Sequence, residues 1–202
     1  MKTVNLSSSF RRRGFTLMEL LIVIGILAVL ATAATLVLNP AELLRQSRDS
    51  TRISDLSTIR NALALYVANV SSPDLDGATS SCTTLCYVHT STGMAANCDG
   101  RHGAKTTTGD TDRTTNAGGW IPVNFGAISG GSPLAVLPID PVTATSTPYN
   151  FYSYACNNTA ITYELNAAFE STKYIDTENY DGTDGGNKDG IYETGTEPDF
   201  DI

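Results

Sequence analysis

The chain has 202 residues and a formal net charge of −8, from 13 basic and 21 acidic residues. This length suits one modest domain plus a helix, and the acidic balance argues against broad nucleic-acid binding through phosphate contacts. Four of the basic residues and none of the acidic residues precede Gly14, so the rest of the chain is more acidic than the whole.

A long apolar segment runs from Phe15 to Leu38 and contains one acidic residue, Glu19, near its start. As a helix of about 24 residues it would be roughly 36 Å long, which is enough to span a bilayer. The basic run before it would keep the N-terminus in the cytoplasm and place the rest of the chain outside. A carboxylate at the centre of a membrane helix costs about 2.5–3.5 kcal/mol, so Glu19 is expected to have a partner.

Two ordinary explanations of this segment are a cleaved signal peptide and a single-pass anchor. In a signal peptide, residues 1–13 would be the basic region, residues 20–30 the apolar core and Ala31-Thr32-Ala33 the cleavage site. Cleavage after Ala33 would release a secreted binding or enzymatic domain. Neither explanation gives a reason for an acidic residue at position 19.

The sequence Gly14-Phe15-Thr16-Leu17-Met18-Glu19, followed by the apolar run 20–24, resembles the N-terminal signature of type IV pilins and type II secretion pseudopilins. The resemblance implies that a prepilin peptidase cleaves after Gly14 and that Phe15 becomes N-methylated. It also implies that Glu19 pairs with the N-terminal ammonium of a neighbouring subunit. Such a pair would offset the desolvation of both charges and would set the register of assembly.

The same resemblance implies an α+β fold in which a long helical spine packs against a small antiparallel β-sheet. Residues 1–14 would be the leader, 15–38 the transmembrane and filament-core helix, 39–70 the amphipathic half of the spine and 71–202 the β-rich head. The implied partners are identical or related pilin subunits, the membrane, and an assembly platform with its ATPase. The subunit would wait in the cytoplasmic membrane and end in a cell-surface or periplasmic filament, either a pilus or a pseudopilus.

After Pro40, apolar residues recur at three- and four-residue spacing over positions 53–70, which predicts an amphipathic helix to about Asn69. One face of this helix would pack on the head. Opposite charges at helical spacing predict a solvated face, with a subunit contact as the alternative. These pairs are Arg45 with Asp49 and Arg52 with Asp55.

Residues 71–119 are rich in Ser, Thr, Gly, Asn and Asp, which predicts long surface loops and corresponds to the variable loop of the resembled family. The chain has four cysteines, which would lie outside the membrane. They allow two disulfides with three possible connectivities, and a Cys/His metal site that includes His89 and His102 is the alternative. The cysteines are Cys82, Cys86, Cys98 and Cys156.

Two segments, Tyr149–Cys156 and Ala160–Phe169, are the best candidates for strands. The second alternates strictly between apolar and polar residues, which predicts one buried face. Asn157-Asn158 supplies turn chemistry, so we expect an antiparallel hairpin that packs on the helix. The proline-rich blocks 120–123 and 137–142 predict extended or edge segments.

The C-terminal region carries acidic and amide side chains among glycines, and such hard oxygen ligands suit calcium. The spacing does not match an EF-hand, but major pseudopilins carry a calcium loop in roughly this place. The candidate ligands are Asp181, Asp184, Asn187 and Asp189. The alternative is an exposed acidic loop held by a short last strand at Ile191 and Tyr192.

The sequence contains no G-x-S-x-G, P-loop or H-E-x-x-H pattern, so it predicts that the protein is not an enzyme.

Overall fold

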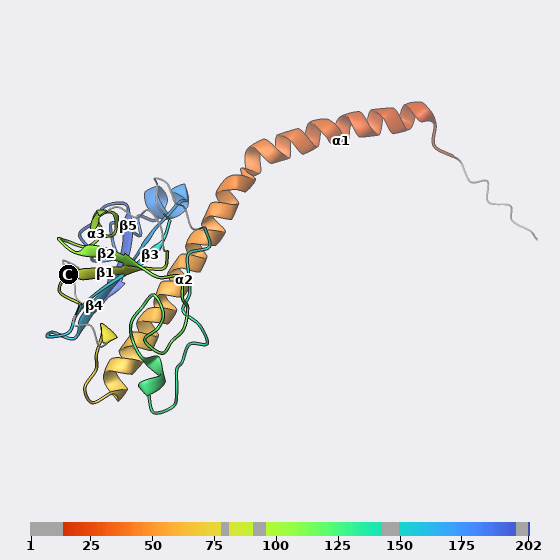
Figure 1. Ribbon diagram of the computed structural model, residues 1–202. Coiled ribbons are helices and arrows are strands. Elements are labelled where there is room, and N and C mark those ends of the chain that lie inside the picture. The colour runs from red at the N-terminus through yellow and green to blue at the C-terminus, as the bar shows by residue number, and fades with distance from the viewer. Residues whose placement is uncertain (1–13, 78–80, 91–95, 143–149, 197–201) are drawn as a thin grey trace, which may run out of the picture. The chain divides into compact units, whose positions relative to one another are not determined.

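Figure 1 shows a computed structural model of the chain, which describes residues 14–77, 81–90, 96–142, 150–196 and 202. The predicted leader lies outside the described residues except for Gly14, and so does Tyr149 at the start of a predicted strand. The chain divides into two compact units, Met1–Pro40 and Ala41–Ile202, and each is described by itself.

The first unit contains the helix α1 (Leu17–Leu38). Its portion Leu17–Thr35 is apolar and entirely unburied, and it is the one helix in the described part of the chain that is long and apolar enough to cross a membrane. A helix that is hydrophobic on every side is stable only in lipid or among other apolar helices. The sequence prediction of an apolar N-terminal helix is thus confirmed.

The predicted spine consists of two helices, because α1 ends at its C-cap Asn39 and a separate helix, α2 (Pro40–Asn69), follows. The backbone of Asn39 is left-handed, with φ 40° and ψ 70°. Pro40 disfavours a helical conformation in the residue before it, and asparagine tolerates the left-handed region better than most residues. The Asn39-Pro40 pair therefore ends one helix and starts the next.

The second unit contains a five-stranded sheet with the order β2-β1-β3-β4-β5. The strands are β1 (Leu85–Val88), β2 (Thr106–Gly109), β3 (Tyr152–Asn157), β4 (Thr162–Ala168) and β5 (Ile191–Gly195). In the described residues between the strands, short helical turns are α3 (Ala96–Gly100), the 3₁₀-helix η2 (Phe125–Ala127) and the π-helix η3 (Lys173–Thr177). The predicted α+β class is confirmed.

The prediction of a purely antiparallel sheet was wrong, because β1 and β2 are parallel while the other pairs are antiparallel. The chain passes from β1 through α3 before it enters β2, and a crossover of this length allows two neighbouring strands to run in the same direction. The stretch 71–119 therefore contributes two strands and buried side chains such as Leu75 and Tyr87, rather than surface loops alone.

The apolar face of α2 packs against the sheet, as the spacing of its apolar residues predicted. Its buried side chains share one core with Tyr154 of β3 and Leu165 of β4. The contributing apolar residues of α2 are Leu56, Ile59, Ala62, Leu63 and Tyr66. Burial of several side chains of this size stabilises the unit by about 1.5–3 kcal/mol each.

The predicted hairpin is confirmed, with β3 and β4 paired from Tyr152↔Ala167 to Asn157↔Thr162. The prediction that β4 has only one buried face was wrong, because Glu164 and Asn166 are also fully buried. A second, smaller core covers that face of the sheet and includes Phe151, Ala155 and a disulfide of α3. The alternation of β4 could not reveal this cover, since it comes from residues remote in sequence.

Two charged residues of α2, Asp49 and Arg52, are fully buried instead of lying on a solvated face. The guanidinium of Arg52 donates to both carboxylate oxygens of Asp140 at 2.7 and 2.8 Å and to Asp49 at 2.7 Å. Glu170 accepts hydrogen bonds from Arg52 and from Arg48. Asp140 belongs to the proline-rich block 137–142, which forms a loop tied to α2 by these charges rather than an edge strand.

Candidate processing and assembly site

Residues 14–16, directly before α1, lead into a helix cap, and the backbone of Thr16 is extended. The side-chain oxygen of Thr16 accepts the backbone N–H of Glu19 at 3.2 Å. In return, the Glu19 carboxylate accepts the backbone N–H of Thr16 at 3.2 Å and its hydroxyl at 3.3 Å. This reciprocal capping box satisfies N–H groups that have no partner inside the helix.

The role of Thr16 was missed at the level of sequence, although the signal was present. A Thr-x-x-Glu pattern directly before an apolar run is the signature of a capping box. The predicted partner of Glu19 was instead an ammonium group on another subunit. The structure gives the acidic residue a first partner in its own chain.

The segment that precedes the cap is accessible. Gly14 and Phe15 are exposed, and the relative solvent exposure of Phe15 is 84%. A Cβ atom added to Gly14 would meet no atom within 4 Å. The fold of this chain therefore does not require a glycine at position 14.

The four cysteines form two disulfides, which settles the connectivity that the sequence left open. Cys82 is joined to Cys156 of β3, and Cys86 of β1 is joined to Cys98 of α3. The first bridge closes a long loop with a sequence separation of 74, and the second closes a short loop with a separation of 12. Two bridges of this kind are typical of proteins in an oxidising compartment.

The alternative of a Cys/His metal site was wrong, because all four sulfurs are used in disulfides and the histidines have other neighbours. The backbone N–H of Tyr152 donates to His89 Nδ1 at 3.1 Å, and His102 Nε2 lies 3.0 Å from the Ser153 hydroxyl. Burial lowers the pKa of His89 to about 4 and that of His102 to about 3, so both rings are neutral at physiological pH.

The residues predicted as calcium ligands lie in the loop before β5. Asp181 and Asp184 accept backbone N–H groups of the loop and of β5 at 2.6–3.0 Å, whereas Asn187 and Asp189 are exposed. Among the residues that the structure describes, no group of three or more His, Cys, Asp or Glu side chains is arranged to hold a metal ion. Calcium binding stays a prediction, and thermal unfolding with calcium and with a chelator would check it.

Residues 9–35 match the family model of the prokaryotic N-terminal methylation motif. The match covers Gly14, Phe15, Glu19 and most of α1. Neither a curated protein nor a solved structure matches the chain. An apolar N-terminal helix with this motif indicates insertion into a membrane. The chain therefore carries, at its N-terminus, the prepilin signature of type IV pilins and pseudopilins.

Proposed function

We propose that this chain is the precursor of a structural, non-enzymatic subunit of a type IV pilus or a secretion pseudopilus. The observation that carries the proposal is an exposed Gly14-Phe15 segment directly before a helix that is apolar on every side and bears the methylation motif. Such a helix is stable in the membrane, and it leaves the membrane only to pack among identical or related helices.

A prepilin peptidase would cleave after Gly14, and the new terminal residue Phe15 would be N-methylated. Two features support this step. The segment is exposed, so a peptidase can reach the peptide bond. The glycine has no packing role in the fold, since a side chain at position 14 would meet nothing. A glycine without a structural reason is best explained by recognition at the cleavage site.

Glu19 would pair with the N-terminal ammonium of a neighbouring subunit and so set the assembly register. After cleavage the amine belongs to Phe15, which precedes the capping residue Thr16. Inside a bundle of apolar helices, an ammonium and a carboxylate that meet offset each other's desolvation, whereas a misplaced subunit leaves both charges unpaired. The acidic residue would therefore penalise wrong registers more than it stabilises the correct one.

The basic residues 11–13 would keep the N-terminus in the cytoplasm and place the second unit on the outer side of the cytoplasmic membrane. Assembly would need a platform membrane protein and an ATPase, because the chain itself has no phosphate-binding loop. The finished filament would lie at the cell surface or in the periplasm.

The register role of Glu19 is tested by comparing Glu19→Ala with Thr16→Ala. Both variants remove the capping box, which costs about 1 kcal/mol, but only the first removes the charge. We expect both variants to insert into the membrane like the wild type. Filament yield in sheared fractions should fall by roughly tenfold or more for Glu19→Ala alone, as expected for a loss of about 1.4 kcal/mol or more per contact.

Two outcomes would contradict this role. One is a wild-type filament yield from Glu19→Ala. The other is an equal assembly defect in Thr16→Ala, since that would reduce Glu19 to a helix cap.

A further inference from the structure

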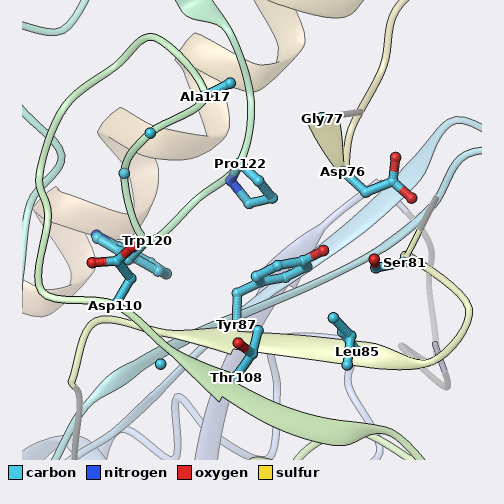
Figure 2. Close-up of a pocket in the computed structure, with 13 residues that line it drawn as sticks. Asp76, Gly77, Ser81, Leu85, Tyr87, Thr108, Asp110, Ala117, Trp120 and Pro122 are labelled. Carbon is cyan, nitrogen blue, oxygen red and sulfur yellow. The ribbon is translucent and has the colours of Figure 1, made fainter. Parts of the chain in front are cut away.

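The second unit contains a pocket of about 540 Å³ that lies far along the chain from the processing site. Figure 2 shows its lining, which comes from three segments: the chain after α2, the strand pair β1–β2, and the loop that leads to Pro122. Pockets of about 300–1,000 Å³ with a few placed polar groups are typical of small-molecule sites.

The floor of the pocket is formed by the strand pair. Tyr87 of β1 is directly opposite Thr108 of β2, so both side chains lie on the same face of the sheet, and Leu85 lies two residues before Tyr87. The ring of Tyr87 packs against Tyr154 at a centroid distance of 5.9 Å, which holds it in place. In Figure 2 its phenol oxygen points toward the side lined by Asp76 and Ser81.

The opposite side of the pocket is lined by Trp120 and Asp110. The indole N–H of Trp120 donates to the carbonyl of Pro138 at 3.1 Å, and its ring packs edge-to-face on His89 at 6.0 Å. Next to it, only a glycine fits at position 119, because a Cβ atom there would lie 2.1 Å from the Thr114 carbonyl oxygen. The backbone of Gly119 therefore forms part of the pocket wall. Both aromatic side chains of the pocket are thus fixed before any ligand arrives, which lowers the entropic cost of binding.

The charges of the lining select against anions. Asp76 and Asp110 contribute two carboxylates, and none of the described residues that line the pocket is a Lys, Arg or His. The Asp76 carboxylate is held by the backbone N–H of Cys82 at 2.8 Å and by the amide of Asn158 at 2.6 Å. A phosphate or nucleotide would meet like charges in a partly enclosed site, where repulsion is stronger than in water.

The remaining chemistry fits a ligand with an apolar face and a rim of hydroxyl groups. Tyr87, Leu85 and Pro122 offer apolar and aromatic surface. Carboxylates accept hydrogen bonds from hydroxyl groups, and the hydroxyls of Ser81 and Thr108 can donate or accept. A pyranose ring has this combination, with C–H groups on its faces and hydroxyls at its edge, and one or two such rings fit the volume.

We propose that this pocket binds a neutral saccharide, with an apolar face of the ring against Leu85 and the accessible edge of Tyr87, and with its hydroxyls directed toward the carboxylates of Asp76 and Asp110. The site belongs to the second unit and does not depend on cleavage or filament assembly. A failure of saccharide binding would therefore leave the proposed function of the N-terminus untouched.

The experiment uses the full chain in a detergent that has no sugar headgroup. Trp120 is the single tryptophan of the sequence, so its fluorescence reports on the pocket directly. The probes are the methyl glycosides of glucose, galactose and N-acetylglucosamine. We expect a saturable fluorescence change for at least one probe, with a dissociation constant on the order of 1 mM. Glucose 6-phosphate should bind more weakly than glucose, because of the two carboxylates.

Two variants and a matched control locate the binding. Tyr87→Ala should weaken it by roughly tenfold or more, because the aromatic edge that contacts the ligand is lost. Since Tyr87 is buried, Thr108→Val serves as a second variant that keeps the shape of the side chain, and it should weaken binding by roughly threefold to tenfold. Thr106→Val changes the same strand two residues away, outside the lining, and should leave the affinity unchanged.

The proposal is overturned if no glycoside gives a saturable signal at about 100 mM, a hundredfold above the expected dissociation constant. It is also overturned if Thr108→Val and Thr106→Val behave alike, if the phosphate-bearing sugar binds as tightly as the neutral one, or if choline binds while the glycosides do not. The last result would assign the pocket to an organic cation held over the aromatic rings.

Discussion

At the scale of single residues, Arg52 connects three parts of the second unit. Its guanidinium forms ion pairs with Asp49 of α2, Asp140 of the loop after η2, and Glu170, which follows β4. Burial opposes the charge of Arg52, but the hydrogen bonds to Asp140 and Glu170 outweigh it and raise the pKa of the guanidinium above its ordinary value. Through these ion pairs, Arg52 holds the loop that contains Asp140 and the segment after β4 against α2.

We predict that Arg52→Ala lowers the free energy of unfolding by about 3–5 kcal/mol, because it leaves buried carboxylates without their counter-charge. Arg45→Ala is the matched control on the same helix. Arg45 is exposed and pairs with Glu42 at 3.7 Å, so its loss should cost about 0–1 kcal/mol. Urea unfolding of the full chain in detergent measures both. A similar small loss for the two variants would contradict the buried network.

Glu164 makes the stability of the sheet depend on pH. It is fully buried in β4, and burial raises its pKa from 4.5 to about 7. The folded state therefore binds its proton more tightly than the unfolded state. This contribution to stability is complete below about pH 4.5 and is lost as the pH rises to about 7.

We predict that Glu164→Gln, which cannot ionise, gains about 1–3 kcal/mol of stability relative to the wild type when the pH is raised from about 5 to about 8. Comparing the two proteins at each pH cancels the opposite contribution of the buried His89. Glu178→Gln, at an exposed position, should show no such change. A stability difference between Glu164→Gln and wild type that stays constant from pH 5 to 8 would refute the assignment.

At the scale of elements, the disulfides fasten the irregular part of the chain to the sheet. The Cys82–Cys156 bridge ties the start of the 82–109 region to β3, and the Cys86–Cys98 bridge ties β1 to α3. The neighbouring strands β1 and β2 have only four residues each, so their own pairing is weak.

We predict that the longer loop contributes more to stability. In the loop-entropy description, closing a loop with a separation of 74 rather than 12 adds about 1.5 kcal/mol. A Cys82→Ser, Cys156→Ser double variant should therefore be less stable than a Cys86→Ser, Cys98→Ser double variant by about that amount. Denaturant unfolding of both proteins in oxidising buffer checks the order, and a reversed order would contradict the entropic account.

The sequence predicted those helices and strands that show a hydrophobic pattern within their own residues. Alternation over 161–169 revealed β4, helical spacing over 53–70 revealed α2, and the apolar run revealed α1. It did not predict β1 and β2, because Leu85–Val88 is short and Thr106–Gly109 has no alternating apolar pattern. It also missed the burial of Arg52 and Glu164, since their partners Asp140 and Glu193 lie far away along the chain. Charge alone does not tell a solvated residue from a paired one.

At the scale of the whole molecule, the two units have different physical characters. The first has a helix with an unburied apolar surface, and the second has its own core, its disulfides and most of the charge. A unit with an apolar surface needs the membrane or other apolar helices around it, whereas the second unit buries its apolar side chains in its own core. This division is what a subunit needs if its N-terminus enters a filament and its remainder faces solvent.

The central claim is that the chain is processed at Gly14, and the mass of the mature N-terminus in the native membrane tests it most directly. We predict N-methylated Phe15 as the first residue, and an unprocessed chain when Gly14→Ala is expressed in the same cells, with its fold unchanged. A mature chain that begins at Ala34, or one that still begins with Met1, would contradict the account.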